Sequence, residues 1–543
     1  MIAISLLWHW SLISEYVAGY DIHHEIYYQN LVLTNSVWDY NFFSNVNSML
    51  SVTMLGPAYS LLLNVDIVWI LKIIYPLFFS LLPMTLFQIY RKQTGDRVAF
   101  YAVFFFMSFS FFFSEAPQLA RQETAELFFA LLVLSLLDRT MAPTRRALLL
   151  IIWGFSITVS HYGLSYFVLF YLALSAILLS LMRNRTLREL WQHLKTRFSQ
   201  GRRGTEIDPP LLNHPWTVLN TSPLTMTYLA IFITFALAWY MYVGSGSPLN
   251  SIVNIGRHTY QTLSDFFIPE AREPAVLMAV GLASPEIISI QRNIYLVVQY
   301  LTQFFIVVGV IKLISNPQKT RFQPLFVALT LISSLLLLLC IVLPYFSRYF
   351  NISRIYHITL LFLAPFCVLG GIAVFRWLVK AVRPRFSRFA NEPVFLRMVV
   401  ILIMVPYFLF STAFIYAVTG DTVNSITLNP RFDFPRYSKQ DVYSKDWLLL
   451  NKETGSPVYA DWYGEKWLVG DPRWGPLIFF GNSEYVRDNA YLFLRSLNVK
   501  RGEVKESPEE FRKYVNLQNS PFGEKVLARR SKIYTNGGAE VYH

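Results

Sequence analysis

The sequence has few charged residues for its length and only two cysteines. Charged residues occupy 15% of the 543 positions, whereas a soluble protein usually carries about a quarter. Cys340 and Cys367 both lie within apolar segments, which argues against a disulfide framework or a Cys–His metal site. The sequence also lacks the Gly-Lys-Ser/Thr phosphate loop and the glycine fingerprint of dinucleotide-binding proteins. A soluble nucleotide cofactor is therefore not expected.

Apolar residues, in contrast, make up 54% of the chain, and the mean hydropathy is +0.38. Before Gly420, apolar blocks recur, many of them close to the ~20 residues that a helix needs to cross a bilayer. We predict a mainly α fold, a polytopic transmembrane helix bundle of about 11 spans. The first span, at residues 1–14, is short. We expect that the chain begins inside or just before a span, as it would if upstream helices were missing. The other predicted spans cover residues 68–90, 97–114, 122–138, 147–160, 163–182, 223–243, 294–315, 323–345, 357–378 and 397–419.

The Lys and Arg residues of the connecting segments predict how the spans are oriented. One set of segments, within residues 91–97, 139–146, 183–203, 312–321 and 376–397, contains 22 of these residues. The alternate set contains only six, which are Arg121, Arg257, Arg272, Arg292, Arg348 and Arg354. We expect the basic-rich set in the cytoplasm, next to anionic lipid head groups. The net charge of +13 therefore reports topology. Nucleic-acid binding is not expected, because no soluble segment has a clustered basic face with stacking aromatics.

A long segment on the predicted outer face, residues 15–67, contains no Lys or Arg. Within it, Ile22–Leu33 and Met49–Leu63 are typical of helices that lie along the membrane surface, with Tyr and Trp suited to the interface. A loop that is acidic, aromatic and close to the bilayer favours a neutral polar substrate next to a lipid.

The strongest local signal in this loop is a cluster of acids and histidines. Asp21 and Glu25 are candidate catalytic residues, because a carboxylate in a partly dry cleft can accept a proton from a hydroxyl nucleophile. His23 and His24 are candidate substrate-binding residues that could tune these acids, or the group could hold a divalent metal. Alternatively, Asp21 simply caps the helix that begins at Ile22.

Two further outer turns contain candidate substrate-binding residues. The first contains Glu115, Arg121 and Glu123, with Arg121 at a helix start between two acids. These residues form either a polar wall of a substrate pocket or an ion pair that merely ends two spans, and exposed pairs add little stability. The other turn contains His161, which is either a ligand or a hydrogen-bonded structural histidine.

Two arginines and a tyrosine precede the span predicted at 357–378. Arg348 and Arg354 are suited to bidentate capture of a phosphate at the outer mouth of a bundle, and Tyr356 joins them as a candidate substrate-binding residue. The alternative is that the arginines extend to lipid head groups from a helix end.

Beyond residue 420 the chain becomes polar and charged, so we divide it into a transmembrane bundle at 1–419 and a soluble extracytoplasmic α/β domain at 420–543. This small domain could cover the membrane-side pocket or bind an acceptor. Its predicted elements are an extended linker at 429–436, a helix at Asp441–Glu453, strands at Pro457–Asp461, Leu477–Phe480 and Tyr491–Leu494, and a terminal hairpin at 532–542 around Asn-Gly.

Several of these motifs, taken in order, resemble a known family. Gly19-Tyr20-Asp21-Ile22-His23-His24-Glu25 after a short apolar helix is similar to the first external loop of GT-C membrane glycosyltransferases, and more closely to that of an uncharacterised archaeal branch. The other similar stretches are Lys72-Ile73-Ile74-Tyr75-Pro76-Leu77, Arg354-Ile355-Tyr356-His357 leading into Leu363-Ala364-Pro365, and Ile533-Tyr534-Thr535-Asn536-Gly537-Gly538. The resemblance covers most of the chain.

The resemblance implies transfer of a sugar from a polyprenyl (dolichyl) phosphate donor to a glycan, lipid or protein acceptor, with inversion, in the archaeal cell envelope. It implies a first-loop aspartate as the base on the acceptor, which Asp21 matches, and a basic residue on the lipid phosphate, for which Arg354 is the candidate. A cofactor does not carry over, because members of the family differ in their use of metal, so a divalent metal stays open.

The alternative function is a transporter or flippase of lipid-linked glycans. Transporters usually place ionisable residues deep within their spans. Here the acids gather in the external loops, which favours the enzyme.

Overall fold

The computed structural model describes most of the chain. The described residues are 1–17, 19, 21–183, 224–282, 289–315, 322–382, 392–421, 437–470, 474, 477–479, 486–505 and 514–543. The predicted linker at 429–436 and the basic residues within 185–203 and 383–388 lie outside them.

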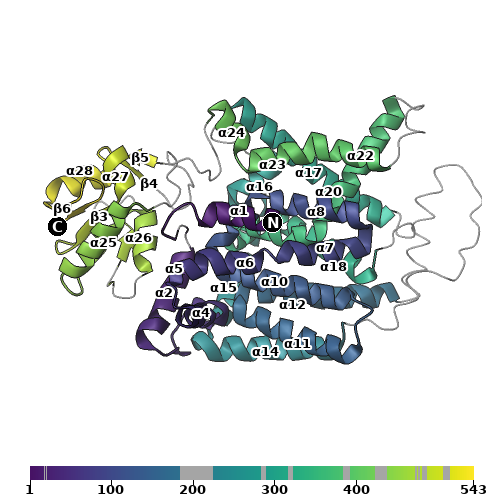
Figure 1. The fold of residues 1–543 in the computed structure, drawn as a ribbon, viewed down its shortest axis with the longest axis horizontal. Helices are drawn as coiled ribbons and strands as arrows, with labels where there is room; N and C mark the ends of the chain where they lie inside the picture. Colours follow the sequence, from purple (N-terminus) through teal and green to yellow (C-terminus); the bar gives the residue numbers. More distant parts are fainter. Residues whose placement is uncertain are drawn as a thin grey trace, which may run out of the picture. The chain divides into compact units, whose positions relative to one another are not determined.

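Two compact units divide the fold (Figure 1). The first, which we call the loop unit, combines Met1–Leu77, Phe113–Glu123 and Ile426–His543. The second, the bundle unit, combines Phe78–Phe112 and Thr124–Ser425. The loop unit thus joins the N-terminal segment and the C-terminal α/β domain, which are far apart in the sequence.

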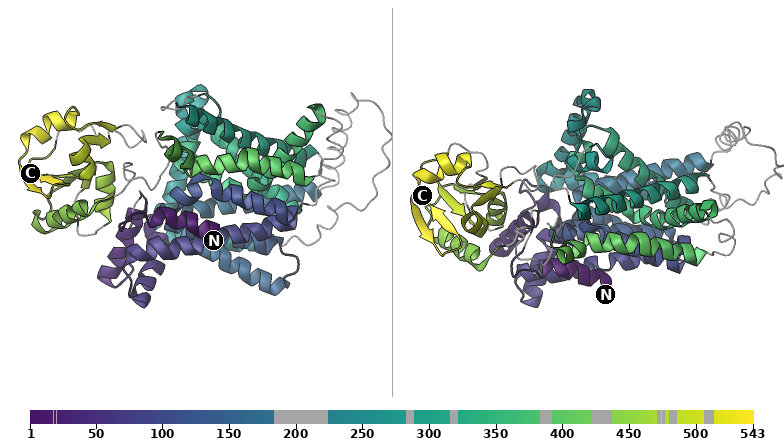
Figure 2. Two further views of the ribbon diagram at one scale, coloured as in Figure 1. Left: turned by 45° about the horizontal axis from the view of Figure 1, so that its top comes forward. Right: turned by 90° about the horizontal axis from the view of Figure 1, so that it is seen from above.

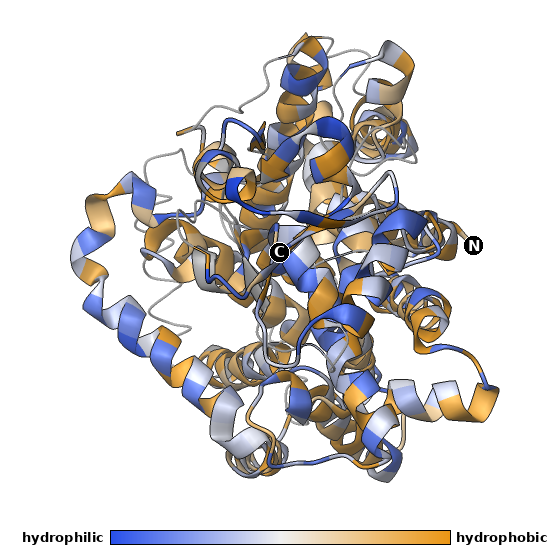
Figure 3. Cartoon of the chain, turned by 90° about the vertical axis from the view of Figure 1, so that its left-hand side faces the viewer, coloured by the Kyte–Doolittle hydropathy of each residue, from blue (hydrophilic) through white to orange (hydrophobic). Residues whose placement is uncertain are grey.

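Seven helices in the described part of the chain are long and apolar enough to cross a membrane, and an eighth span results if one bent helix pair counts as one. Figure 3 colours the ribbon by the hydropathy of each residue, and hydrophobic residues recur along the helices. The seven spans are Ile67–Thr94, Tyr162–Leu181, Met226–Gln261, Ile290–Ser315, Pro324–Val342, Ile352–Val382 and Glu392–Ser411. The prediction of a mainly α polytopic bundle with a small C-terminal α/β domain is therefore confirmed.

The other three predicted spans are helices that are shorter or less apolar. Residues 1–14 contain α1, Ile2–Ser11. The helix α10, Ala120–Leu137, carries Arg121, Glu123 and Glu126 near its start, and α11, Pro143–Ser160, begins with a pair of arginines. The charges of α10 and α11, the short length of α1 and the bend in one further span account for the difference between the predicted count of about 11 and these seven helices.

The helices of the bundle unit lie side by side, with α11, α12 and α14 against one another (Figure 1). Their bounds are α7 Leu82–Thr94, α8 Asp96–Ser108, α9 Ser110–Ser114, α12 Tyr162–Arg183, α14 Met226–Tyr242, α17 Ile290–Ser315, α18 Pro324–Val342, α20 Ile352–Val382, α22 Glu392–Val399, η9 Val400–Met404, α23 Val405–Ser411 and α24 Phe414–Thr419. The closest packing is between α17 and α20, because a Cβ atom on Gly370 would lie 1.8 Å from the Phe305 carbonyl oxygen. A small residue is required there.

One span is broken. The helices α8 and α9, continued by η3 at Ala116–Gln118, meet at an angle of 61°. The break falls at Phe109, whose backbone is extended, with φ −70° and ψ 127°. The helix predicted at 97–114 is therefore bent.

A proline interrupts the longest helix, α20, without ending it. Pro365 lies inside the 31 residues of this helix and removes the hydrogen bond to the carbonyl four residues earlier. The Tyr90 hydroxyl donates to that freed carbonyl, at Leu361, over 3.0 Å, and to the Leu360 carbonyl over 3.2 Å. Tyr90 from α7 thus replaces the hydrogen bond that the proline removes, and buried carbonyls in membrane helices require such a partner.

A dipeptide in the segment between α15 and α16 of the bundle unit joins the ends of two helices. Arg272 donates from Nε to the Ile341 carbonyl over 3.2 Å and from Nη2 to the Val342 carbonyl over 2.9 Å, at the C-terminus of α18. Glu273 Oε2 accepts a 3.0 Å bond from the Ile352 amide at the start of α20. Each charge complements the helix dipole that it faces. The short elements around the dipeptide are η5 Val243–Gly246, α15 Ser247–Gln261, η6 Leu263–Phe267, η7 Pro269–Ala271, α16 Pro274–Ala279 and α19 Phe346–Phe350.

The N-terminal segment of the loop unit, after α1, is mostly helical. The predicted helix Ile22–Leu33 is α2, Asp21–Asn35, and the predicted helix Met49–Leu63 is split into α3, Leu50–Thr53, and α4, Leu55–Leu63. These helices pack on the first turns of the following span around a core of Val17, Ile22, Ile26, Val52, Ile67, Ile70, Leu71, Tyr75 and Ala120. The other elements here are η1 Val46–Ser48, α5 Ile67–Trp69, the π-helix η2 Ile70–Ile74 and α6 Tyr75–Phe79.

A five-stranded sheet in the order β2-β1-β3-β7-β6 forms the C-terminal domain. Strands β1, β2 and β3 are parallel. Strand β7 pairs antiparallel with β3, and β6 pairs antiparallel with β7 to form the predicted hairpin. Side chains alternate between two apolar clusters, one with α25 and α26 and the other with α28, and Figure 2 shows helices on both sides of the strands. The bounds are α25 Lys439–Asn451, β1 Val458–Ala460, α26 Trp462–Val469, β2 Leu477–Phe479, β3 Tyr491–Leu494, α27 Ser496–Arg501, β4 Glu503–Lys505, β5 Tyr514–Asn516, α28 Pro521–Lys525, η10 Leu527–Arg529, β6 Lys532–Thr535 and β7 Glu540–Tyr542.

Asp461, at the end of β1, has a structural role in this domain. Its Oδ1 accepts from the Gly464 amide at the start of α26, and both oxygens lie 2.8 Å from Nε of Arg495. Asn498 adds a third donor at 3.2 Å. Both charged side chains are buried, so this pair fastens the ends of the two parallel strands.

Candidate functional site

The central feature of the loop unit is one guanidinium between two carboxylates. Nη2 of Arg121 lies 3.1 Å from Oδ2 of Asp21, and Nη1 lies 3.5 Å from Oε1 of Glu25. The Glu25 side chain has no exposed surface, whereas 15% of the Asp21 side chain is exposed. The structure therefore brings these three predicted residues together and leaves Asp21 as the accessible acid.

The local sequence explains how this geometry arises. Gly19 has φ +142°, and a Cβ atom there would lie 2.7 Å from Oε1 of Gln118, so only glycine lets the chain pass this close before Asp21. Glu25, one helical turn after Asp21, accepts a 3.0 Å bond from the Ala120 amide with Oε2. Glu25 thus caps the N-terminus of α10, as an acid there should, and brings Arg121 beside α2.

Burial sets the charge of the inner acid. It raises the pKa of Glu25 to about 7, and the Asp21 carboxylate adds to this increase. Arg121 and backbone hydrogen bonds from Arg121 and Ala120 oppose it. Glu25 therefore changes its charge close to neutral pH, which alters how strongly Arg121 is engaged by Asp21.

The two histidines of α2 lie toward the C-terminal domain. His23 is buried edge-on against Tyr437, with ring centroids 5.6 Å apart, and burial lowers its pKa to about 3. His24 is half-buried, and burial and the Lys466 ammonium on α26 lower its pKa, while Asp21 opposes them. Both imidazoles are therefore neutral at pH 7. Neutral His24 can exchange hydrogen bonds with a hydroxyl group.

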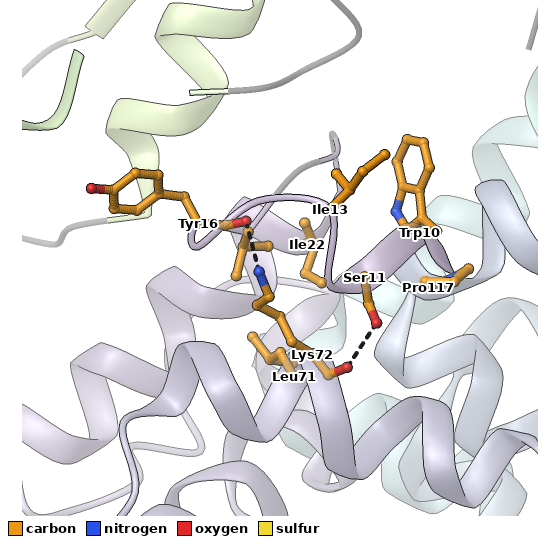
Figure 4. A pocket seen from close by; sticks show the side chains of 9 residues that line it. Trp10, Ser11, Ile13, Tyr16, Ile22, Leu71, Lys72 and Pro117 are labelled. Atoms are coloured by element: carbon orange, nitrogen blue, oxygen red, sulfur yellow. Dashed lines mark hydrogen bonds between the residues drawn. The ribbon is translucent and has the colours of Figure 1, made fainter. Parts of the chain in front are cut away.

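A small pocket lies beside the loop that leads into α2 (Figure 4). Lys72, in the π-helical turn η2, is buried at its edge and donates to the carbonyls of Ser14 and Tyr16. The Ser11 hydroxyl donates to the Lys72 carbonyl over 2.8 Å. Lys72 therefore ties down the loop before Asp21, a role that sequence reasoning did not assign. The pocket is lined by Trp10, Ser11, Ile13, Tyr16, Val17, Ile22, Leu71, Lys72 and Pro117.

Two other predicted residues belong to the same unit. Glu115 is half-buried and precedes η3, where its carbonyl accepts from the Gln118 amide over 3.0 Å. Glu123 is buried in the first turn of α10. Among the described residues, no group of three or more His, Cys, Asp and Glu side chains is arranged to hold a metal ion.

The remaining predicted residues belong to the bundle unit. His161 separates α11 from α12, and its Nδ1 accepts a 3.0 Å bond from the Leu164 amide, as a structural histidine would. Arg354 lies half-buried in the first turn of α20, and Tyr356 packs edge-on against Phe109 with centroids 5.1 Å apart. Arg348 lies in α19, and its side chain is outside the described residues.

Sequence reasoning missed a buried contact between two ionisable side chains in the bundle unit. His357 Nδ1 lies 3.1 Å from Oε2 of Glu126, and both side chains are buried. The spacing in the sequence could have indicated these residues. Glu126 follows Glu123 by three residues and so shares a helix face with it, and His357 is related to Arg354 in the same way.

The sequence profile of a family described as "Predicted membrane protein (DUF2206)" matches residues 146–542. The chain belongs to this family. No curated protein matches the sequence of this DUF2206 protein.

Solved structures of other membrane proteins are similar to this DUF2206 chain at 13% identity or less. The archaeal oligosaccharyltransferase AglB from Archaeoglobus fulgidus, in complex with an inhibitory peptide and a dolichol-phosphate, is 12% identical, with 92% of this chain and 70% of that chain covered and a TM-score of 0.47. ArnT from Cupriavidus metallidurans, bound to undecaprenyl phosphate, is 10% identical, with coverage of 100% and 96% and a TM-score of 0.47. The arabinofuranosyltransferase AftD from Mycobacteria is 11% identical, with coverage of 100% and 39% and a TM-score of 0.44.

Proposed function

We propose that this multi-pass membrane protein is a glycosyltransferase that moves a sugar from a polyprenyl phosphate to a hydroxyl-bearing acceptor, a glycan, lipid or protein, on the outer face of the cell membrane. The observation that supports the proposal best is the unequal pair of acids on α2. Arg121 lies against both, yet Glu25 is fully buried and Asp21 keeps 15% of its side chain exposed. A single accessible carboxylate in a mostly dry setting is what a general base requires.

The proposed step uses Asp21 as that base. As the acceptor oxygen attacks the anomeric carbon of the donor sugar, the hydroxyl proton moves to the Asp21 carboxylate. The bond between that carbon and the phosphate oxygen breaks, and its electron pair leaves with the polyprenyl phosphate. One base and one direct displacement invert the configuration at the anomeric carbon.

Arg121 and Glu25 adjust this base. A guanidinium at 3.1 Å fixes the position of the Asp21 carboxylate but also reduces its basicity, because an opposite charge stabilises the ionised form. Ionised Glu25 shares the same guanidinium, which restores basicity to Asp21. We propose that Glu25 acts in this way and does not touch the substrate.

Donor recognition is proposed for Arg354. Its place in the first turn of α20, before a long apolar helix, suits a guanidinium that makes two charge-assisted bonds to a phosphate at the membrane surface. Arg348, in the preceding helix α19, is the second candidate.

The decisive experiment is a transfer assay. The purified protein in lipid nanodiscs is incubated with radiolabelled dolichyl-phosphate hexoses and an acceptor extract, beside an Asp21→Asn protein prepared identically. Label that moves from the dolichyl phosphate to another molecule only with the wild type supports the proposal. Label that stays on the dolichyl phosphate for every sugar tested, with intact protein, contradicts it.

The buried Glu126–His357 pair favours a second candidate function, transport of a lipid-linked glycan, because transporters carry ionisable residues within their spans. Proteoliposomes loaded with a labelled lipid-linked glycan distinguish the two functions. A transporter moves the intact molecule between leaflets, whereas a transferase separates the sugar from its lipid phosphate.

A further inference from the structure

The ionisable pair in the bundle unit is enclosed by aromatic rings. Glu126 and His357 are both buried, and Nδ1 of the imidazole lies 3.1 Å from the carboxylate. The rings of Phe106 and Phe111 lie on the imidazole, with centroids 4.6 and 4.7 Å away and planes tilted by 32° and 33°. The ring of Phe109 is 6.3 Å away.

These contacts place His357 at the break in the span. Phe106 belongs to α8, Phe111 belongs to α9, and Phe109 is the extended residue between them. Tyr356 packs edge-on against the same Phe109. The second turn of α20 therefore packs against both α8 and α9, the two parts of the broken helix. Glu126 connects the same turn to α10.

A pair of this kind is costly to keep for stability alone. Two charged or polar groups lose their water, and replacing a buried ion pair by apolar residues of similar volume is often neutral or stabilising. Five phenylalanines already surround the imidazole, since Phe79 and Phe112 also lie within 6.4 Å. An apolar residue at this position would pack well, so the pair indicates a requirement for one specific geometry.

The geometry it fixes is that of the outer half of α20. Pro365 interrupts the hydrogen bonds of this helix, which weakens the coupling of its first turns to the rest. Tyr90 holds the helix at the interruption. Arg354 is three residues before His357, on the same face of the helix. The rotation of the first turn, and hence the direction of the Arg354 guanidinium, therefore depends on what holds His357.

We infer that Glu126 and His357 are positioning residues that set Arg354 for capture of the donor phosphate. This inference rests on the proposed function, in which Arg354 contacts the lipid phosphate. The pair does not touch the substrate. It fixes the setting of α20 by joining the helix to α10 and to the break between α8 and α9.

The test compares stability with phosphate-lipid binding in the full chain. Dissociation constants for dolichyl phosphate and melting temperatures are measured in nanodiscs for Glu126→Gln, for Glu126→Leu with His357→Leu, and for Tyr171→Phe. Tyr171→Phe is the matched control, because it removes another buried hydrogen bond of the same unit, the 2.9 Å bond between the Tyr171 and Ser333 hydroxyls. In all variants kcat and the donor KM are determined separately.

We expect Glu126→Gln, which keeps an acceptor for Nδ1 but removes the charge, to raise the dissociation constant and the donor KM several-fold with kcat nearly unchanged. The double leucine variant should melt within a few degrees of the wild type yet bind dolichyl phosphate about tenfold more weakly. Tyr171→Phe should leave binding unchanged.

Wild-type affinity in both Glu126 variants would overturn the inference and leave the pair a structural one. A wild-type protein that binds no dolichyl phosphate and transfers no sugar would instead contradict the proposed function. If the double variant fails to fold, Glu126→Gln alone decides, since its hydrogen bond is retained.

Discussion

Oε2 of Glu25 accepts a hydrogen bond from the backbone amide of Ala120, 3.0 Å away and 95 residues later in the chain. This bond places the start of α10 against α2, so that the next residue, Arg121, meets Asp21. A buried acid that caps one helix thereby positions the partner of an accessible acid on another. The proposed role of Asp21 as the base depends on these contacts.

Asp21→Asn separates catalysis from folding. Asn caps helices about as well as Asp but does not accept the proton. The variant should express and melt like the wild type and transfer sugar about 10²–10⁴-fold more slowly, measured by release of labelled hexose from its lipid. Near-wild-type transfer would reassign the base to Glu25 or Glu123.

The pH dependence of transfer should report Glu25. Its pKa is raised to about 7, so between pH 6 and pH 8 it loses a proton and gains a negative charge. The ionised Glu25 carboxylate competes with Asp21 for the Arg121 guanidinium. Asp21 then becomes more basic, so kcat should rise as the pH passes about 7. Glu25→Gln should abolish the rise. Glu15→Gln, an exposed acid in the same loop paired with Lys439, is the control, and an unaltered profile in Glu25→Gln would exclude the mechanism.

Arg354→Lys tests phosphate recognition. Lysine keeps the charge but cannot form the two parallel bonds of a guanidinium, and a bond to a charged group contributes roughly 1.5–3 kcal/mol. Dolichyl phosphate should bind about tenfold or more weakly, measured in nanodiscs, while folding is retained. Arg257→Lys on α15 serves as the control. Unchanged affinity would shift the role to Arg348 or Arg121.

Orientation is tested by protease access. The 22-to-6 distribution of basic residues predicts that residues 420–543 lie outside the cell. Protease added to intact spheroplasts should remove this tail, followed with an antibody to a C-terminal tag. A tail that is cleaved only after permeabilisation would reverse the topology and place Asp21 in the cytoplasm.

The C-terminal domain should depend on Arg495 far more than on an exposed pair. Arg495→Met leaves the buried Asp461 carboxylate without its guanidinium, which costs about 3–5 kcal/mol. Lys532→Met breaks the exposed 2.6 Å pair with Glu540 and should cost at most about 1 kcal/mol. Tail proteolysis of the full chain across a urea series measures both, and equal sensitivity would contradict the prediction.

Hydropathy predicted the spans of this fold well, because long apolar blocks have few alternatives in a membrane. Helix ends were less predictable, since side-chain caps set them. The helix predicted from Asp441 begins at Lys439, because Ser438 is its N-cap and Asp441 closes a capping box with it. The extended backbone at Phe109 and the π-helical turn at Lys72 have no local signal, because tertiary packing determines them.

The candidate site was predictable only in part. Asp21, Glu25 and Arg121 were each selected from their neighbours in sequence, but the contact between Asp21 and Arg121 spans 100 residues. Glu126 and His357 are 231 residues apart, and neither is unusual within its own segment. A single sequence does not show such pairs, because each depends on how the helices pack.

The dipeptide Arg272–Glu273 constrains its loop in another way. Its two side chains reach the ends of two different helices, the carbonyls of α18 and the first amide of α20. If one residue were inserted between Arg272 and Glu273, either Arg272 would lose the carbonyls of α18 or Glu273 would lose the first amide of α20. Outer loops usually tolerate changes in length. At this dipeptide the loop has a fixed length, and insertions are confined to either side of it.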